Sequence, residues 1–370
     1  MEKAYKFRIY PTLEQEALIQ RTFGCCRFVF NYFLAERIAL YRDSGGILNY
    51  NACSAEMTGL KKSLGWLGEP DSTALQSSLR DLDAAYQNFF RRAQSGGKPG
   101  FPRFKSKRDR RKSYKSKRVG ENIAVFDKHI KLPKLGLVRA AISKLVQGRI
   151  LNATVSQSAS GKYFVSICCT DVDIEAYGAT GASVGLDMGL KELVVTSDDA
   201  AYPNHKHIMH SEKELAKAQR KLSRKSIGSR NREKARVKAA RIQERIANQR
   251  RDAIHKVTTQ IIRDYDVICI ENLHVKGMVR NRKLAKAISD ASWGEIKRQL
   301  EYKSKWHGRA LVQVGRFYPS SQLCGCGHQN KDVKDLSVRQ WICPACKTLN
   351  DRDVNAANNI LKEGLRLLAG

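Results

Sequence analysis

Three short segments decide how this chain is interpreted: Cys324-Gly-Cys326, Cys343-Pro-Ala-Cys346 and Asp351-Arg-Asp353-Val-Asn355. Two close pairs of thiols stand just ahead of two carboxylates, and the carboxylates open a segment with the pattern of a helix. The thiols could hold a metal ion for structure, and the carboxylates could hold one for chemistry. The rest of the sequence must therefore tell which chemistry the carboxylates serve.

The net charge of the chain indicates its partner. Of 370 residues, 67 are Lys or Arg and 36 are Asp or Glu, which gives +31, and 42% are hydrophobic, as in a globular protein of two or three domains. The positive charge is clustered. Residues 101–120 contain ten Lys or Arg and one acidic residue, and residues 213–256 contain sixteen Lys or Arg and four acidic residues. A compact chain with this surplus repels itself without an anionic partner, so we expect nucleic acid.

Cysteine usage predicts a reducing compartment. The first ten residues alternate like a strand and do not form an apolar signal segment, and no apolar run is long enough to span a membrane. We therefore expect no membrane partner and a cytoplasmic location, where paired thiols favour metal over disulfides. The other cysteines are expected in the core, and they are Cys25, Cys26, Cys53, Cys168, Cys169 and Cys269.

The first half of the chain predicts strands interrupted by a helical insertion. Residues 3–10 alternate as a strand, and Thr12 with Gln15 forms a capping box, so a helical segment begins there and runs to about residue 117. From about 120 to 180 short strands return, with a hairpin at 158–161, so the first strand could join them in a small β-barrel. The run 101–108 interleaves bases with aromatic residues, which suits a nucleic-acid strand better than a solvated linker.

The second half predicts an α/β domain with acids at the ends of its strands. Asp187 and Glu271 each follow an apolar run, and strand interiors disfavour acids. Asp351 and Asp353 open the last helix, where either one also fits a helix cap. Converging carboxylates repel one another unless hard cations such as Mg²⁺ or Mn²⁺ neutralise them. Two such ions on a basic protein indicate hydrolysis of phosphodiesters.

The chain resembles TnpB, the RNA-guided DNA nuclease of bacterial insertion sequences and a relative of type V CRISPR effectors. The resemblance covers nearly the whole chain and rests on fragments in a fixed order: Phe7-Arg-Ile-Tyr-Pro11, Gly100-Phe-Pro-Arg-Phe-Lys105, Gly185-Leu-Asp-Met-Gly189, Glu271-Asn-Leu-His-Val-Lys-Gly-Met278, Phe317-Tyr-Pro-Ser-Ser321 and Asp351-Arg-Asp-Val-Asn-Ala-Ala357.

The resemblance implies four parts. The first is an N-terminal, wedge-like β-barrel from residues 1–11 and 118–180, which carries a helical recognition domain inserted at 12–117. The second half would be an RNase H-like (RuvC) nuclease domain of the α/β class, built from residues 181–317 and 351–370. A zinc-ribbon insertion would occupy residues 318–350.

The resemblance also implies the site and its partners. Asp187, Glu271 and Asp353 match the catalytic acids, which would hold Mg²⁺ or Mn²⁺. A guide RNA from the transposon end would direct the cleavage of double-stranded DNA beside a short adjacent motif, by a monomeric ribonucleoprotein in the bacterial cytoplasm, associated with the nucleoid. Candidate nucleic-acid contacts, from the resemblance and from the basic runs, are Tyr50, Gln76, Arg103, Lys105, Lys107, Arg108, Arg224 and Lys225.

The first thiol pair departs from the family pattern. The family has two residues between these thiols, whereas Cys324 and Cys326 have only Gly325 between them, which we expect to strain the turn. We predict a tetrahedral Zn²⁺ site formed by Cys324, Cys326, Cys343 and Cys346. Two alternatives are that His328 replaces one of the first two thiols, and that the segment binds no metal.

Two other functions remain open from the residues alone. A guided DNA-binding repressor would bind without cutting, although its acids would be dispensable and here all three are present. A strand-transfer transposase would use the same carboxylate chemistry and make joined products. The histidines at 205, 207 and 210 could bind metal, but we expect a polar surface loop.

Overall fold

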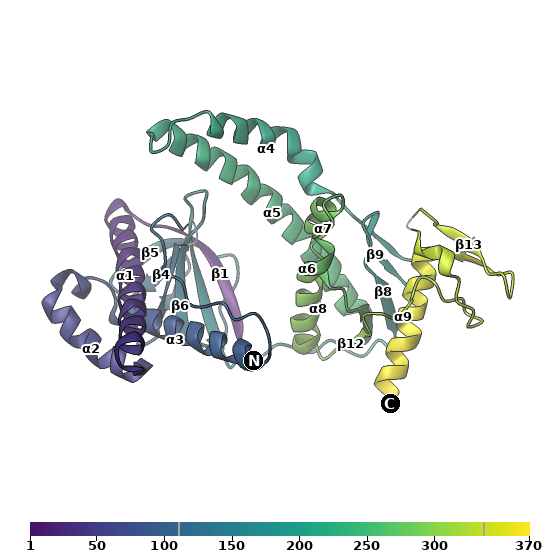
Figure 1. The fold of residues 1–370 in the computed structure, drawn as a ribbon, viewed down its shortest axis with the longest axis horizontal. Coiled ribbons are helices and arrows are strands. Elements are labelled where there is room, and N and C mark those ends of the chain that lie inside the picture. The colour runs from purple at the N-terminus through teal and green to yellow at the C-terminus, as the bar shows by residue number, and fades with distance from the viewer. Residues whose placement is uncertain (110–111, 336) are drawn as a thin grey trace. The chain divides into compact units, whose positions relative to one another are not determined.

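The structure is a computed structural model that describes residues 1–109, 112–335 and 337–370. Two residues of the basic run, Arg110 and Arg111, lie outside the described residues. The chain divides into two compact units, Met1–Asp173 and Ile174–Gly370, which are described one at a time (Figure 1).

A seven-stranded antiparallel sheet forms the centre of the first unit. Its order is β2-β6-β7-β1-β5-β4-β3, so the first strand of the chain lies between strands from beyond residue 130. Alternate residues of β1 are buried, among them Tyr5, Phe7 and Ile9, as a half-buried strand requires. Closure of this sheet into a barrel stays a prediction. The strands are β1 (Lys3–Tyr10), β2 (Lys112–Lys117), β3 (Ala124–Val125), β4 (His129–Leu132), β5 (Gly136–Ala141), β6 (Arg149–Gln157) and β7 (Tyr163–Thr170).

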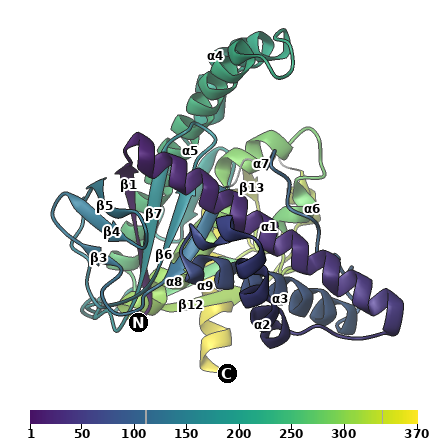
Figure 2. The ribbon, with the colours of Figure 1, turned by 90° about the vertical axis from the view of Figure 1, so that its left-hand side faces the viewer.

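Three α-helices follow β1 and precede β2 in the chain. Thr12 and Gln15 form the predicted capping box at the start of α1 (Leu13–Ser44). A second helix, α2 (Tyr50–Ser63), and a short 3₁₀ turn, η1 (Gly65–Gly68), lead to α3 (Ser72–Gln94). Leucines at helical spacing on α3, Leu75, Leu79 and Leu82, are buried. Helices α1 and α3 pack together and contact β2, and Figure 2 shows α1 as the longest of the three.

A five-stranded sheet organises the second unit. Strands β8 (Ser183–Asp187), β11 (Val267–Glu271) and β12 (Ala310–Val314) run parallel, while β9 (Glu192–Thr196) and β10 (Ala201–Pro203) are antiparallel to their neighbours, in the order β10-β9-β8-β11-β12. Parallel neighbours with helical connections confirm the α/β pattern expected for this half of the chain.

Helices cover both faces of this sheet. On one face, Val184, Leu186, Ile268 and Ile270 pack with residues of α5 (Arg230–Asp264), α7 (Ala285–Ala291) and α8 (Trp293–His307). On the other face, Cys269 and Val314 pack against Ile360 of α9 (Arg352–Ala369). Figure 1 shows α8 and α9 on opposite sides of the strands.

Two glycines allow α9 to lie directly on the sheet. A Cβ atom on Gly185 of β8 would lie 2.0 Å from the backbone oxygen of Ala357, and one on Gly364 of α9 would lie 2.2 Å from Sγ of Cys269. Real Cβ atoms do not approach so closely, so any side chain at either position would push the helix away. These glycines therefore fix the distance between α9 and the strands that end in Asp187 and Glu271.

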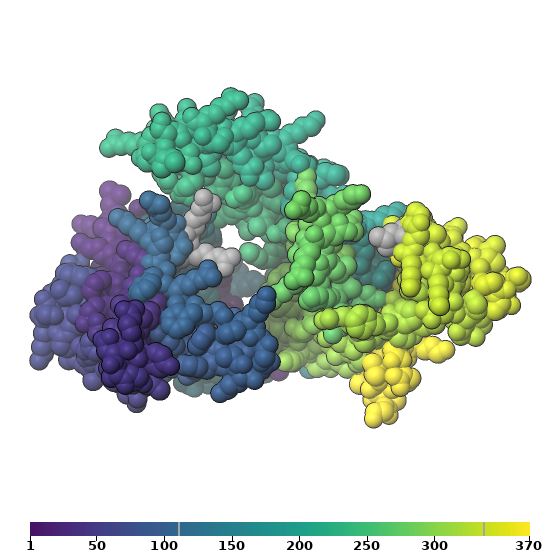
Figure 3. Space-filling model, viewed as in Figure 1, coloured from purple at the N-terminus to yellow at the C-terminus, as the bar shows by residue number. Residues whose placement is uncertain are grey.

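The remaining elements form two projections from the sheet. Helices α4 (His207–Ser223) and α5 pair as a hairpin that carries the basic residues of 213–256, and Figure 3 shows it in teal-green. A short helix, α6 (Val275–Met278), follows β11. Between β12 and α9, the thiol-bearing segment contains a 3₁₀ turn, η2 (Lys331–Lys334), and the antiparallel pair β13 (Gln340–Ile342) and β14 (Leu349–Asp351).

Candidate active site and thiol cluster

Asp187 and Glu271 end two adjacent parallel strands on the same face of the sheet. Side chains alternate along a strand, so Asp187 shares the face of Gly185, and Glu271 shares that of Cys269. Gly185 and Cys269 both face α9. Because the carboxyl ends of parallel strands lie at one edge, the two carboxyl groups lie beside the start of that helix.

The start of α9 distinguishes the two candidate acids there. The side chain of Asp351 accepts hydrogen bonds from the backbone N–H groups of Asp353 and Val354, at 3.0 and 3.1 Å, so Asp351 is the N-cap. Asp353 lies in the first turn, and its carboxylate is not used for capping. Asp351 is therefore the helix cap, and Asp353 remains the candidate for the third catalytic acid.

The three carboxyl groups interact electrostatically. Burial, together with the negative charges of Glu271 and Asp353, raises the pKa of Asp187 to about 8. Burial also raises the pKa of Glu271, while a hydrogen bond donated by the Ser320 hydroxyl lowers it. A carboxyl group that resists ionisation beside two others is a favourable place for a cation, which would neutralise the repulsion. The oxygen donor set suits Mg²⁺ or Mn²⁺.

An arginine that the sequence analysis missed also lies at this site. Nη1 of Arg339 is 3.2 Å from Oδ2 of Asp353, and the positive charges of Arg352 and Arg339 lower the pKa of Asp187. Arg339 immediately precedes β13, and its backbone oxygen accepts a 2.8 Å hydrogen bond from the N–H of Arg352. The available signal was the short strand pattern on each side of Cys343-Pro-Ala-Cys346, which predicts a hairpin and brings Arg339 opposite the start of α9.

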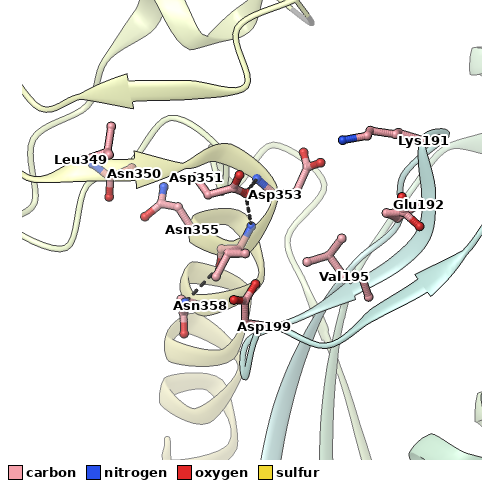
Figure 4. A pocket seen from close by; sticks show the side chains of 12 residues that line it. Lys191, Glu192, Val195, Asp199, Leu349, Asn350, Asp351, Asp353, Asn355 and Asn358 are labelled. Atoms are coloured by element: carbon pink, nitrogen blue, oxygen red, sulfur yellow. Dashed lines mark hydrogen bonds between the residues drawn. The ribbon is translucent and has the colours of Figure 1, made fainter.

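A cavity of about 470 Å³ adjoins Asp353 (Figure 4). Lys191, Glu192 at the start of β9 and Asp199 line it on one side, and Asp353 with Asn355 and Asn358 of α9 lines it on the other. The lining is polar and carries one base, Lys191, against four acids, so its charge favours a solvated cation over an anion.

The four paired thiols are gathered closely. Their sulfur atoms all lie within 4.8 Å of one another, with Cys324 and Cys346 3.5 Å apart and Cys326 and Cys343 3.7 Å apart. Zn–S bonds of about 2.3 Å in a tetrahedron place sulfur atoms about 3.8 Å apart, so the residues fit a zinc ion. Within residues 1–109, 112–335 and 337–370, no other group of three or more His, Cys, Asp or Glu has its ligand atoms gathered in this way. The carboxylates of Asp187, Glu271 and Asp353 are therefore less tightly gathered than the thiols, and neither the histidines at 205–210 nor His328 join a group of this kind.

The shortened first pair closes through a tight turn. The backbone N–H of Cys324 donates to the oxygen of His328 at 2.9 Å, and that of Gly327 donates to the oxygen of Cys324 at 2.9 Å. Gly327 has a φ of +90°, which a residue with a side chain rarely adopts. One thiol of each pair has a polar neighbour, because Nδ2 of Asn350 lies 3.7 Å from Sγ of Cys324 and Oγ1 of Thr348 lies 3.3 Å from Sγ of Cys346.

The candidate nucleic-acid-binding residues differ in how far their side chains are exposed. Arg103, Lys107, Arg108, Arg224 and Lys225 are exposed, the last two at the tip of the α4–α5 hairpin. Tyr50 begins α2 with the guanidinium of Arg80 4.6 Å from its ring centre, and Gln76 is half-buried on α3.

Unlike its exposed neighbours, Lys105 is held in place by contacts of both its backbone and its side chain. Its backbone N–H donates to Oδ1 of Asn31 at 2.7 Å, and its Nζ lies 3.9 Å from the ring centre of Phe30. Burial lowers the pKa of its ammonium group. Lys105 and Lys107 nevertheless line a cavity of about 370 Å³ together with other basic side chains, Arg27, Lys112 and Lys115.

None of the helices in the described residues is long and apolar enough to cross a membrane.

Three family descriptions match parts of the chain. A probable transposase family matches residues 166–282, a Cas12f1-like TNB domain matches residues 293–360, and a helix-turn-helix domain matches residues 1–46. In the last range the structure has a strand and one continuous helix, β1 and α1. The TNB match spans the thiol cluster, Arg339 and Asp353.

Relatives match almost the whole chain. A protein of Streptomyces pristinaespiralis named "Putative RNA-guided DNA endonuclease" is 40% identical over 99% of this chain and 90% of its own length. An Escherichia coli protein named "Putative RNA-guided DNA endonuclease InsQ" is 35% identical over 99% of this chain and 93% of its own. A solved chain from a Cas12f1–sgRNA–target DNA complex superposes with a TM-score of 0.63, at 13% identity, over 97% of this chain and 98% of its own. That likeness shows a shared fold.

Proposed function

The chain belongs to the TnpB family, as its relatives of 40% and 35% identity along nearly the full length show, and on this premise we propose that it is an RNA-guided DNA endonuclease. It would be directed by a guide RNA from the transposon end to double-stranded DNA beside a short adjacent motif. One observation carries the proposal most directly: the carboxyl group of Asp187 interacts electrostatically with Glu271 and Asp353 at one edge of the sheet.

We assign the nuclease domain to residues 181–317 and 351–370, with the RNase H-like (RuvC) fold. Three parallel strands with helices on both faces, and acids at the ends of β8 and β11, support this assignment. The thiol-bearing insertion at 318–350 would be a zinc ribbon. In the first unit, residues 1–11 and 118–180 would form the barrel-like part, and residues 12–117 would form the helical recognition part.

The three acids would hold divalent cations, which supply a nucleophilic water and stabilise the charge of the leaving oxygen when they are bound. Asp187 and Glu271 are rigidly placed, because each ends a strand packed between helices. Asp353 is oriented by the Asp351 cap, which fixes the first turn of α9. Arg339, which pairs with Asp353 in this structure, is near enough to exchange this partner for a phosphate oxygen of the strand.

The basic surfaces would bind nucleic acid by its phosphates. Exposed Lys and Arg side chains gather at the tip of the α4–α5 hairpin. Others, Arg103, Lys107 and Arg108, lie in the basic run that follows residue 102. Sequence would be read by base pairing between the guide RNA and the target strand, and the protein would contact backbone and the short motif. We propose a monomeric ribonucleoprotein as the active particle.

The direct test is purification of the protein with co-expressed transposon-end RNA, followed by incubation with a plasmid library that carries the target beside randomised sequence. The proposal predicts Mg²⁺-dependent linear products that require both the matching guide and one adjacent motif. Joined DNA products would indicate strand transfer instead. Tight, salt-sensitive, guide-dependent binding without cut ends would indicate a guided repressor.

A further inference from the structure

An apolar pocket of about 470 Å³ lies in the first unit, away from the basic cavity described above. The last turns of α1, the loop after it, the C-terminal half of α3 and Phe101 form its walls. Ile47 is 84% exposed and Tyr41 is 69% exposed at this site. Pockets of this volume, with apolar walls and a few polar groups, are typical of sites for small organic ligands.

Aromatic rings make up one wall. The ring centre of Phe101 lies 5.7 Å from that of Tyr86 and 5.4 Å from that of Phe89, both edge to face, and Phe90 stacks 6.2 Å from Tyr86. Phe90 and Phe101 are 54% and 46% exposed, so part of each ring surface is not covered by the fold. A planar, aromatic ligand would cover such surfaces by stacking.

A buried arginine supplies the pocket with a polar group. Arg37 lines the pocket and is only 8% exposed, and its Nε has no hydrogen-bond partner among the described residues. Its Nη2 lies 3.4 Å from Oδ1 of Asp83, and its guanidinium lies 5.1 Å from the ring centre of Tyr86. The Nε atom itself is enclosed by the protein, so it is the guanidinium group as a whole that supplies the pocket with hydrogen-bond donors for a carbonyl or ring nitrogen of a ligand.

The chain that leads from α3 through Phe101 is strongly basic. Residues 86–108 contain seven Lys or Arg and no Asp or Glu. This charge suits a ligand that carries phosphate, whereas it opposes a second copy of this chain, whose net charge is +31. A planar aromatic group with hydrogen-bond acceptors, attached to phosphate, is a nucleotide.

We propose that this pocket binds an unpaired base of the guide RNA, by stacking on Phe90 and Phe101 with Arg37 contacting the base edge. The inference rests on the proposed function for the identity of the strand. A target duplex keeps its bases paired and stacked, whereas single-stranded parts of a folded RNA present unstacked bases that can stack on aromatic side chains, which favours the guide over the DNA target.

The test measures binding of the full chain to a fluorescein-labelled single-stranded RNA of about 12 nucleotides and to DNA of the same sequence, over a series of salt concentrations. Phe90→Ala and Phe101→Ala should each weaken RNA binding about five- to fifty-fold. Because these variants remove no charge, the slope of log affinity against log salt should stay unchanged. Phe101→Trp should retain affinity.

Matched variants separate stacking from loss of structure. Phe126 is 52% exposed in the same unit and does not line the pocket, so Phe126→Ala should leave RNA binding unchanged. Ile47→Glu changes a side chain that is 84% exposed, so it should leave thermal unfolding unchanged, yet its negative charge should lower RNA affinity. Circular dichroism and the unfolding temperature check that each variant is folded.

Unchanged RNA binding by folded Phe90→Ala, Phe101→Ala and Ile47→Glu variants would overturn the inference. An equal loss for DNA would overturn the assignment to RNA, and self-association of the unchanged protein that Ile47→Glu abolishes would make the pocket an interface between copies. Failure of the proposed function gives a different result: the unchanged protein would bind RNA through the pocket but cut no guided target.

Discussion

Arg339 and Asp353 form an ion pair, 3.2 Å between Nη1 and Oδ2, that joins the thiol-bearing segment to the first turn of α9. Arg339 immediately precedes β13 and Cys343 immediately follows it, so three residues separate the arginine from a thiol. The hairpin pairs β13 with β14, which leads into α9. The thiol cluster is therefore built into the same short structure that positions one side of the candidate active site.

Replacing Arg339 should impair cutting more than binding. Arg339→Gln removes a positive charge close to the proposed phosphate position, and the loss of one electrostatic contact at a reacting group typically lowers the rate about 10²- to 10³-fold. Single-turnover cleavage and RNA affinity should be measured together. Arg316 offers a control because it is exposed and does not contact the acids in the described structure, so Arg316→Gln should cut normally. Equal rates for both variants would contradict a role for Arg339.

The thiol cluster should bind one zinc ion per chain. Native mass spectrometry and elemental analysis should find the metal in the unchanged protein and not in Cys343→Ser, because three thiols hold zinc more weakly than four. Trp341 is 6% exposed and packs with Cys324 and Cys343, so its fluorescence should change when the metal is removed. Cys168 lies elsewhere, and Cys168→Ser should keep the zinc. A metal-free unchanged protein with all four thiols reduced would refute this prediction.

Gly185 should be intolerant of a side chain. Gly185→Ala places a methyl group 2.0 Å from the backbone oxygen of Ala357, so α9 must move, and we expect a loss of unfolding free energy of at least about 2 kcal/mol together with lost cleavage. Gly59 lies inside α2 with nothing within 4 Å of the corresponding position. Gly59→Ala should therefore stabilise the protein by about 0.5–1 kcal/mol. Thermal or denaturant unfolding compares the two, and a tolerated Gly185→Ala would show that α9 is not held so closely.

Lys303 should make stability depend on pH in the alkaline range. Burial lowers the pKa of this lysine to about 8, although its Nζ donates to the oxygen of His255 and to the hydroxyls of Thr258 and Thr259. A base whose pKa is lower in the folded state costs stability while it is charged, so the free energy of unfolding should rise between pH 8 and about 10.5.

Denaturant unfolding at several pH values measures this rise, and Lys303→Met is the comparison. The methionine cannot titrate, so the difference between the two proteins should change with pH by up to about 3 kcal/mol. Lys297 is partly exposed on the same helix and pairs with Glu301 at 3.8 Å, so Lys297→Met should not change the alkaline slope. A parallel pH profile for Lys303→Met would mean that this lysine is not responsible.

The parts of the fold that sequence predicts are those with local signals. Apolar runs that end in an acid predicted β8 and β11, and the capping box of Thr12 and Gln15 predicted the start of α1. Hydrogen bonds show that Asp351 is the cap, and the role of Asp353 as a metal ligand stays a prediction, because a cap and a metal ligand look alike in sequence. Arg339 was missed because its position depends on pairing across a hairpin. The aromatic pocket was missed because α1 and Phe101 come together only in the folded first unit.

The measurement that most directly tests the central claim is guided cleavage by Asp187→Asn, a variant of nearly the same shape that cannot carry the negative charge. Guide RNA affinity and plasmid cleavage should be measured on the same preparation with Mg²⁺. The account predicts unchanged RNA binding and a loss of cleavage of at least about 10³-fold. Cleavage by Asp187→Asn at the rate of the unchanged protein would contradict it.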